Sequence, residues 1–315
     1  MSNIYTANPA NIKKAAEIIR SGHLVAFPTE TVYGLGANVY DAKAVASIFA
    51  AKERPSFNPL ISHIAEIDFL SEYVETDSRA IELARHFWPG PFTMVLKRKE
   101  HTSSIDLACA GLPTATVRMP NHPVALSLIR SSGVPIVAPS ANRSQTISPT
   151  TAQHVADSLG NRVDMILDGG PCSVGVESTI VDVTGKNVVL LRAGGIALED
   201  IEAFLNEKVL VSHGEADRPS SPGQMLKHYA PKHRFQINVL HPEKGVFYIG
   251  FGNQQNTDLN LSPCGDLKEA AANLFAYMRI ADEMSGDKGI AIAPIPEQGL
   301  GLAINDRIRR ASYEK

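Results

Sequence analysis

Short apolar runs alternate with amphipathic helical patterns along most of this 315-residue chain, and this alternation restricts its fold more than any other feature. Short runs rich in β-branched residues are typical of buried strands, and an apolar period of about 3.6 residues is typical of helices. The predicted strands cover residues 24–27, 92–97, 114–118, 135–139, 165–167, 178–183 and 188–192. The predicted helices cover residues 9–21, 41–52, 77–87, 123–131, 151–159 and 199–205. This alternation predicts a fold of the α/β or mixed α+β class.

The length of the chain and a change of texture after residue 210 predict two domains. At roughly 100–200 residues per domain, the chain is long enough for two. The segment 217–223 (DRPSSPG) has the composition of a loop, whereas 267–284 is typical of a long helix in a second α/β unit. We therefore expect a first domain over 1–210, a linker over 211–234 and a small C-terminal domain over 235–315.

The charge and the cysteines exclude several classes of protein. A formal net charge of −3 argues against a surface built as a whole to hold nucleic acid, although it leaves room for a local basic site. Cys109, Cys172 and Cys264 are too far apart for a zinc or redox motif and are typical of reduced thiols in a cytosolic protein. The N-terminus has no signal-peptide pattern, and no apolar run approaches the roughly 20 residues that span a membrane. We expect a cytoplasmic protein.

Two polar clusters lie on either side of the helix predicted over 41–52. The first, PTETVYGLG at 28–36, follows the apolar run 24–27, at a point where a strand ends. The second, KERPSFNPLISH at 52–63, follows the helix. Polar residues at the ends of strands and helices are common ligand groups in α/β folds, so the two clusters predict two sides of one ligand site.

The standard nucleotide-binding motifs do not occur in this sequence. It contains no G-x-x-x-x-G-K-[ST], and Gly34 and Gly36 would need a third glycine where Val39 stands. It has no G-x-S-x-G elbow and no histidine pair at helical spacing that would indicate a metal. A bound nucleotide would therefore be held by separate cations and hydroxyl groups.

Several such groups are present, each with a purely structural alternative. Lys52 and Arg54 stand near a helix C-terminus, where cations are favoured by the helix dipole whether or not they bind a ligand. Arg118 ends a strand and would form either a buried ion pair or a bidentate clamp for carboxylate or phosphate. Ser140 and Asn142 would stabilise a turn or contact a ligand. Taken together, they suit an anionic substrate rich in phosphate.

Eight short segments occur in a characteristic order: 27–36 (FPTETVYGLG), 51–55 (AKERP), 58–61 (NPLI), 88–91 (WPGP), 117–120 (VRMP), 138–142 (APSAN), 175–179 (GVEST) and 191–192 (LR). The linker adds Ser221-Pro-Gly and 228–231 (HYAP). In this order the eight segments resemble the YrdC-like domain family, and the linker with its C-terminal domain resembles the two-domain branch of that family, the threonylcarbamoyl-AMP synthases. The resemblance implies a twisted mixed sheet flanked by helices and a small Rossmann-like C-terminal unit.

The resemblance also implies an activity. Enzymes of this family join L-threonine, bicarbonate and ATP to threonylcarbamoyl-AMP and release pyrophosphate, and a tRNA threonylcarbamoyltransferase complex then consumes the product. Mg²⁺ would accompany the triphosphate. A weak contact with tRNA would also fit. Such a transfer depends on positioning and charge neutralisation more than on a covalent nucleophile.

The resemblance carries roles to individual residues. Lys52 and Arg54 would be catalytic. Lys52, Arg54 and Asn58 would face the phosphates, and no residue would hold a metal directly. The threonine-binding residues would be Thr31, His63, Arg118 and Ser178. The ATP-binding residues would be Arg54, Asn58, Thr114, Ser140, Asn142, Ser148, Arg192 and Tyr229. Tyr229 would belong to a linker that closes over the site, and Gly34 and Gly36 would be turn residues that let Thr31 face the amino acid.

Two other functions remain open from the sequence alone. The first is an RNA-binding protein without catalytic activity that uses the same basic concave surface. The second is another carbamoyl-handling enzyme, because YrdC-like domains also occur in hydrogenase maturation. That relative carries zinc-finger cysteine pairs and an acylphosphatase segment, and this chain has neither.

Overall fold

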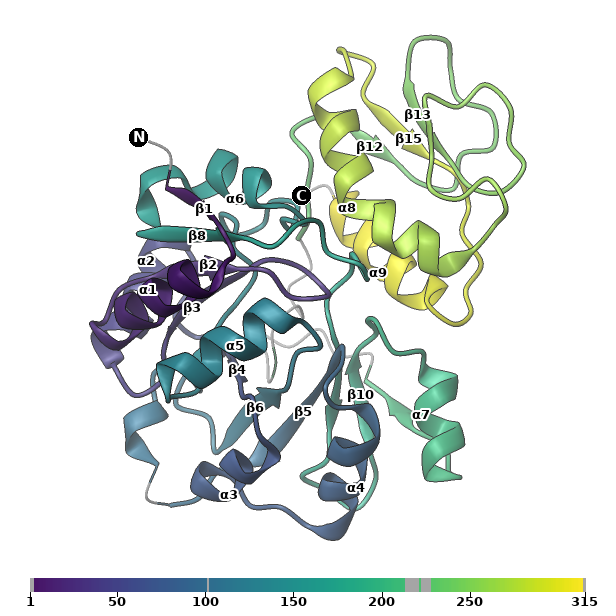
Figure 1. Ribbon diagram of the computed structural model, residues 1–315. Helices are drawn as coiled ribbons and strands as arrows, with labels where there is room; N and C mark the ends of the chain where they lie inside the picture. Colours follow the sequence, from purple (N-terminus) through teal and green to yellow (C-terminus); the bar gives the residue numbers. More distant parts are fainter. Residues whose placement is uncertain (1–2, 101, 213–220, 222–227, 314–315) are drawn as a thin grey trace.

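The computed structural model describes residues 3–100, 102–212, 221 and 228–313. These residues form an eleven-stranded sheet with its helices and a separate four-stranded unit (Figure 1). Both units mix strands and helices, so the predicted α/β (mixed α+β) class is confirmed. The linker residues 213–220 and 222–227 lie outside the described part of the chain.

The elements of the first unit follow the predicted alternation closely. Its strands are β1 (Ile4–Thr6), β2 (Val25–Phe27), β3 (Gly34–Asn38), β4 (Ile61–His63), β5 (Phe92–Lys97), β6 (Thr114–Arg118), β7 (Ile136–Val137), β8 (Met165–Asp168), β9 (Thr179–Asp182), β10 (Val189–Arg192) and β11 (Leu210–Val211). Its helices are α1 (Pro9–Arg20), α2 (Ala42–Lys52), α3 (Leu70–Tyr73), α4 (Ser78–Phe87), α5 (Pro123–Ser132), α6 (Ala152–Leu159) and α7 (Leu198–Leu205). The sequence patterns did not reveal β1, β3, β4, β11 or α3.

The large sheet is mixed, in the order β1-β8-β2-β3-β7-β4-β6-β5-β9-β10-β11. Its parallel pairs include β4 with β6 and β5 with β9, and its antiparallel pairs include β2 with β3 and β5 with β6. Helices α1 and α5 cover one face, and α2, α4 and α6 cover the other. In β2, Val25 and Phe27 pack toward α1 and α5, while Ala26 packs into the opposite core. Because both faces are buried, the strand is apolar throughout.

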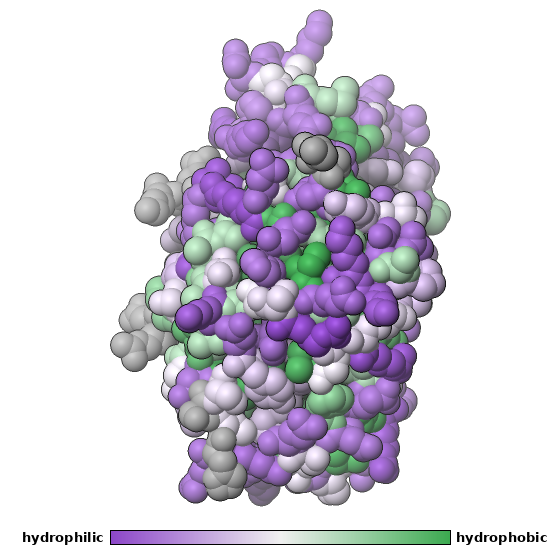
Figure 2. Space-filling view, turned by 60° about the vertical axis from the view of Figure 1, so that its left-hand side comes forward, coloured by the Kyte–Doolittle hydropathy of each residue, from purple (hydrophilic) through white to green (hydrophobic). Residues whose placement is uncertain are grey.

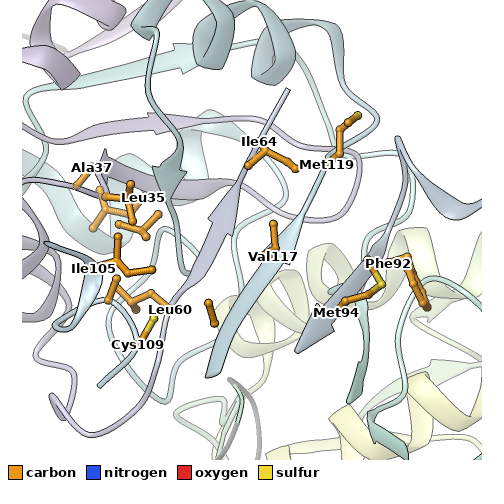
Figure 3. Close-up of a cluster of buried hydrophobic side chains, with 14 of the residues drawn as sticks. Leu35, Ala37, Leu60, Ile64, Phe92, Met94, Ile105, Cys109, Val117 and Met119 are labelled. Atoms are coloured by element: carbon orange, nitrogen blue, oxygen red, sulfur yellow. The ribbon is translucent and has the colours of Figure 1, made fainter. Parts of the chain in front are cut away.

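One predicted turn is in fact a strand. Gly34 and Gly36 lie in β3, which pairs antiparallel with β2. The prediction that they are turn residues is therefore wrong. A Cβ on Gly36 would come within 2.8 Å of both Ile136 Cγ2 and Phe27 Cε1, so a glycine at this position allows neighbouring side chains to approach closely. Figure 3 shows the adjoining core, where Leu35 and Ala37 of the same strand lie beside Ile105 and Leu60.

The C-terminal unit is a small parallel α/β domain. Its strands are β12 (Phe235–Gln236), β13 (Phe247–Gly250), β14 (Leu259–Asn260) and β15 (Ile290–Ile292), in the order β12-β15-β13-β14, and its helices are α8 (Leu267–Met284) and α9 (Gly301–Ala311). All its strand pairs are parallel, as a Rossmann-like unit requires. Both helices contribute to one core, which also takes in Val32, Ile147 and Val176 of the first domain. The two domains therefore share a hydrophobic interface.

In Figure 2 most of one face is hydrophilic, with small separate hydrophobic areas. Within the described ranges, no helix combines the length and the apolar character needed to cross a bilayer.

Candidate active site

A cavity of about 50 Å³ lies where the large sheet meets the linker residues His228 and Tyr229. It is lined by Thr29, Thr31, Val32, Gly34, Arg54, Ile61, His63, Arg118, Ala138, Pro139, Ser140, Glu177, Ser178, Arg192, His228 and Tyr229. Eight residues predicted for the site are among them: Thr31, Arg54, His63, Arg118, Ser140, Ser178, Arg192 and Tyr229. The two polar clusters that flank helix α2 thus meet in one cavity.

Strand pairing creates the wall around Arg118. The register places Arg118 of β6 opposite His63 of β4 on one side and Thr93 of β5 on the other. Arg118 Nη2 lies 2.6 Å from Glu30 Oε1, and Nη1 donates a hydrogen bond to Thr31 Oγ1 at 2.9 Å. The sequence allowed either an ion pair or a clamp for an anion, and the structure shows a buried ion pair in the cavity wall. An incoming carboxylate would meet a guanidinium that is already oriented.

A second guanidinium lies at the adjoining strand ends. Arg192, at the end of β10, donates from Nε and Nη2 to the carbonyl oxygen of Ser178 at 3.1 and 2.8 Å. Its Nη2 also lies 3.2 Å from Ser178 Oγ, which in turn is 2.7 Å from Thr93 Oγ1. Thr93 is also the residue of β5 that pairs with Arg118 of β6, so the network of Arg192 adjoins Arg118. The predicted threonine and nucleotide groups therefore share one wall.

The end of helix α2 places its two cations differently. The helix is terminated by Glu53 in the left-handed conformation, with φ of 53°. Lys52 is buried, and its ammonium donates to the carbonyl oxygens of Ser140 and Asn142, both at 2.5 Å. Arg54 lies beyond the turn, donates to Pro59 O at 3.2 Å and lines the cavity. Arg54 thus faces the cavity, whereas Lys52 supports its wall.

Linker residues close the cavity. His228 and Tyr229 both line it, and their rings lie 3.9 Å apart. The Tyr229 ring stacks on Phe275 of α8 at 5.3 Å, so the linker is held against the C-terminal domain. His228 Nδ1 is buried and has no hydrogen-bond partner within the described residues. These two linker residues thus bring polar atoms to the cavity lining.

The remaining predicted residues lie outside the cavity lining. Asn142 uses its amide nitrogen within its own loop, donating to Thr146 O at 2.8 Å. Ser148 Oγ donates to Glu177 Oε1 at 2.7 Å. Asn58 is buried behind the lining, and Thr114 lies at the opposite end of β6 from Arg118. Their roles in ATP binding stay predictions.

The sequence reasoning missed three polar lining residues. Thr29 lies in the first polar cluster, where its hydroxyl bonds Thr31 Oγ1 at 2.8 Å. Glu177 and His228 occur inside segments that were recognised, 175–179 and 228–231. Nothing in the local sequence separates a buried glutamate or histidine from a solvated one. Both depend on contacts with the C-terminal domain, which no local pattern reveals.

Two histidines of the cavity make the fold sensitive to acid. Burial, and then the charge of Arg118, lower the pKa of His63 from its usual 6.5 to about 3. Burial likewise lowers the pKa of His228 to about 3. Below pH 6.5 the two histidines are therefore protonated in the unfolded chain but stay neutral in the folded chain. The free energy of unfolding consequently falls as the pH drops from 6.5 toward 3.

We expect the free energy of unfolding to fall by on the order of 2–3 kcal/mol for each of these histidines between pH 7 and pH 4.5. Urea unfolding at a series of pH values measures this loss. His63→Asn should flatten the dependence, whereas His241→Asn, at an exposed position, should leave it intact. Equal pH dependence in all three proteins would contradict the assignment.

Fold and cavity together define a two-domain α/β protein with a closed, cation-lined site for an anionic small molecule. A family model described as "Telomere recombination" (Sua5/YciO/YrdC) matches residues 17–194, and one described as "Threonylcarbamoyl-AMP synthase, C-terminal domain" matches residues 196–312. The chain belongs to the threonylcarbamoyl-AMP synthase family, in its two-domain form.

Full-length relatives agree with this membership. The threonylcarbamoyl-AMP synthase of Bacillus subtilis is 41% identical, over 98% of this chain and 94% of the relative. That of Pyrococcus abyssi is 43% identical, over 96% of this chain and 94% of the relative. The crystal structure of P. abyssi Sua5 complexed with L-threonine superposes with a TM-score of 0.89 at 39% identity, covering 98% of this chain and 96% of that chain. Escherichia coli YciO matches 62% of this chain and 96% of its own length, with a TM-score of 0.52 and 25% identity.

Proposed function

We propose that this protein joins L-threonine, bicarbonate and ATP to threonylcarbamoyl-AMP and releases pyrophosphate. The observation that carries the proposal is the shared wall in which Arg118 lies beside Thr31 and His63, while Arg54 and Arg192 line the same cavity. One guanidinium suits the carboxylate of an amino acid, and the other two suit phosphates. The threonine complex of the P. abyssi protein, which has the same fold, supports the amino-acid half.

In the proposed reaction the threonine nitrogen attacks the carbon of bicarbonate, and water leaves to give a carbamate. A carbamate oxygen then attacks the α-phosphorus of ATP, and the bond from that phosphorus to the pyrophosphate oxygen breaks. Arg118 would hold the carboxylate, and neutral His63 would accept a hydrogen bond from the substrate. Arg54 and Arg192 would neutralise negative charge on the phosphates. Each group positions or neutralises, and none needs to form a covalent intermediate.

We propose that the linker residues at the cavity move when ATP binds. About 50 Å³ is far below the roughly 300–1,000 Å³ typical of sites for larger ligands, and ATP does not fit in it. His228 and Tyr229 occupy the closing side, so we propose that they withdraw for ATP to enter and return afterwards. This motion corresponds to the lid predicted from the family resemblance.

We propose no metal site made by the protein itself. The described residues contain no group of three or more His, Cys, Asp or Glu side chains that could hold an ion. Glu177, the carboxylate at the cavity, is paired with an arginine. We therefore propose Mg²⁺ only as part of the ATP substrate, carried by its phosphates.

The RNA-binding alternative receives little support from this geometry. Arg118 and Arg192 are 3% and 7% exposed, so neither can follow an RNA backbone. We propose instead that the adenylate passes to a tRNA threonylcarbamoyltransferase complex in the cytoplasm, and that any direct tRNA contact of this chain is weak.

Pyrophosphate release tests the proposed function directly. We expect the purified full chain with Mg²⁺ and ATP to release pyrophosphate only when both L-threonine and bicarbonate are present. L-Serine, which lacks the methyl group, should support slower release. Release at the same rate without threonine would contradict the proposal. RNA binding with a steep salt dependence and no ATP chemistry would favour the alternative.

A further inference from the structure

A residue of the C-terminal domain reaches the wall of the cavity. Arg307, on α9, has no exposed surface. Its Nε donates to Glu177 Oε2 at 3.0 Å, and its Nη1 donates to the carbonyl oxygen of Ala193 at 2.6 Å. Ala193 directly follows Arg192, and Glu177 directly precedes Ser178. One side chain of the second domain thus contacts both segments that carry the nucleotide-side groups of the first.

Glu177 connects Arg307 to the cavity, because it contacts Arg307 and also lines the cavity. Its other oxygen, Oε1, accepts a hydrogen bond from Ser148 Oγ at 2.7 Å, and its backbone oxygen accepts one from Gly195 N at 3.0 Å. Each carboxylate oxygen therefore has a partner, Ser148 of the first domain for Oε1 and Arg307 of the C-terminal domain for Oε2. Among the described lining residues, Glu177 is the acidic one.

A carboxylate in the wall of an anion site needs a compensating charge. Unpaired, Glu177 would repel the phosphates that Arg54 and Arg192 attract. Burial alone would raise the pKa of Glu177, but Arg307, followed by Arg192 and Ser148, lowers it to about 2. The carboxylate consequently stays ionised at neutral pH. Arg307, which also pairs with Asp306 at 3.0 Å, is its cationic partner from the second domain.

Two contacts of α8 also join the C-terminal domain to the first domain near Glu177. Gly175, with φ of 74°, packs so closely on α8 that a Cβ would lie 2.4 Å from Ala271 O. Arg279 of α8 donates to the carbonyl oxygen of Ile147, next to Ser148. The C-terminal domain therefore contacts the first domain at three places around Glu177, two of them through α8 and one through Arg307 of α9.

We propose, on the basis of the proposed synthase function, that Arg307 is a positioning residue of the ATP subsite. It neutralises and fixes Glu177, so that the cavity offers a net positive charge to the triphosphate and Ser178 and Arg192 keep their places. The C-terminal domain is by this inference a structural part of the active site rather than an appended module.

Steady-state kinetics of full-length variants test this role. Arg307→Met removes the charge while keeping a long side chain, and we expect the KM for ATP to rise roughly tenfold or more, with a much smaller change in the KM for threonine. The matched control is Arg309→Gln on the same helix, whose partner Glu297 is exposed. The control should leave both constants unchanged. An unchanged KM for ATP in Arg307→Met, or an equal rise in the control, would overturn the proposal.

A rescue experiment separates charge compensation from general damage. In Arg307→Met, Glu177 loses its main partner and burial raises its pKa, so lowering the pH should protonate it and reduce the KM for ATP. The double variant Arg307→Met/Glu177→Gln removes both buried charges, which should restore folding if the single variant is unstable. It should bind ATP better than the single variant and lose the added pH dependence. A double variant no better than the single would contradict the charge argument, whereas a wild type that does not need threonine would contradict the proposed function instead.

Discussion

Replacing Arg118 by alanine is expected to destabilise the fold by about 3–5 kcal/mol and to abolish measurable saturation by threonine. The substitution leaves the Glu30 carboxylate, 6% exposed, buried without its cation. It also removes the donor to Thr31 Oγ1 and the donor to Gly90 O at 3.2 Å. The same guanidinium is the proposed partner of the threonine carboxylate, so stability and threonine affinity should be lost together.

Thermal or urea unfolding and threonine-dependent pyrophosphate release measure the two effects. Arg130→Ala is the matched control, because Arg130 pairs with Glu66 at 2.8 Å with both side chains more than half exposed. Such a surface pair contributes at most about 1 kcal/mol, and the control should keep full activity. The double variant Arg118→Ala/Glu30→Gln should recover stability but not threonine affinity. Recovery of both would show that Arg118 only neutralises Glu30.

The parts of the fold that were predictable are those specified locally. The helix over residues 41–52 was predicted from its apolar period, and the side chain of Asp41 caps its start by accepting from the amides of Lys43 and Ala44. Strands β5 and β6 begin and end at the predicted residues, because each is a short apolar run bounded by polar or turn residues. Capping residues and short apolar runs depend on neighbours in the sequence, so they can be recognised without knowledge of the tertiary structure.

The parts that were missed depend on tertiary contacts. Strand β3 carries two glycines, and only its packing against Phe27 and Ile136 explains why glycine stands in a strand. Helix α9 was not predicted because polar Asn305 and Arg307 occupy buried positions and interrupt its apolar period. The buried polar side chains of this helix therefore concealed it from a search for apolar periodicity.

The same distinction applies to the site. Arg118 and Arg192 could be proposed because each ends a strand, and strand ends converge at an edge of a sheet. Glu177 could not, because its environment is created by a helix more than a hundred residues further along the chain. Lys52 was recognised as part of a polar cluster, but its sequence context could not tell a cation that faces substrate from one that supports the wall.

Lys52→Met should separate these two roles, since we expect activity to fall by roughly a hundredfold while stability changes little. Burial lowers the pKa of Lys52 well below its usual 10.5, and the charge of Arg54 lowers it further. A buried ammonium therefore destabilises the fold, and methionine would remove this destabilisation. Against this gain stands the loss of two hydrogen bonds, to Ser140 O and Asn142 O. The two effects on the free energy of unfolding oppose each other.

The effect of Lys52→Met on activity is not offset in this way. Without the ammonium, the turn that carries Ser140 loses its tether to α2, and a displacement of about 1 Å in a positioned group can cost about a hundredfold in rate. Lys43→Met, at an exposed position on the same helix, is the matched control and should change neither property. Unfolding curves, and pyrophosphate release with ATP varied at saturating threonine and bicarbonate, test both expectations. Full activity in Lys52→Met would exclude both roles, whereas a reduced turnover with an unchanged KM for ATP would favour direct contact with the reacting phosphate over support of the wall.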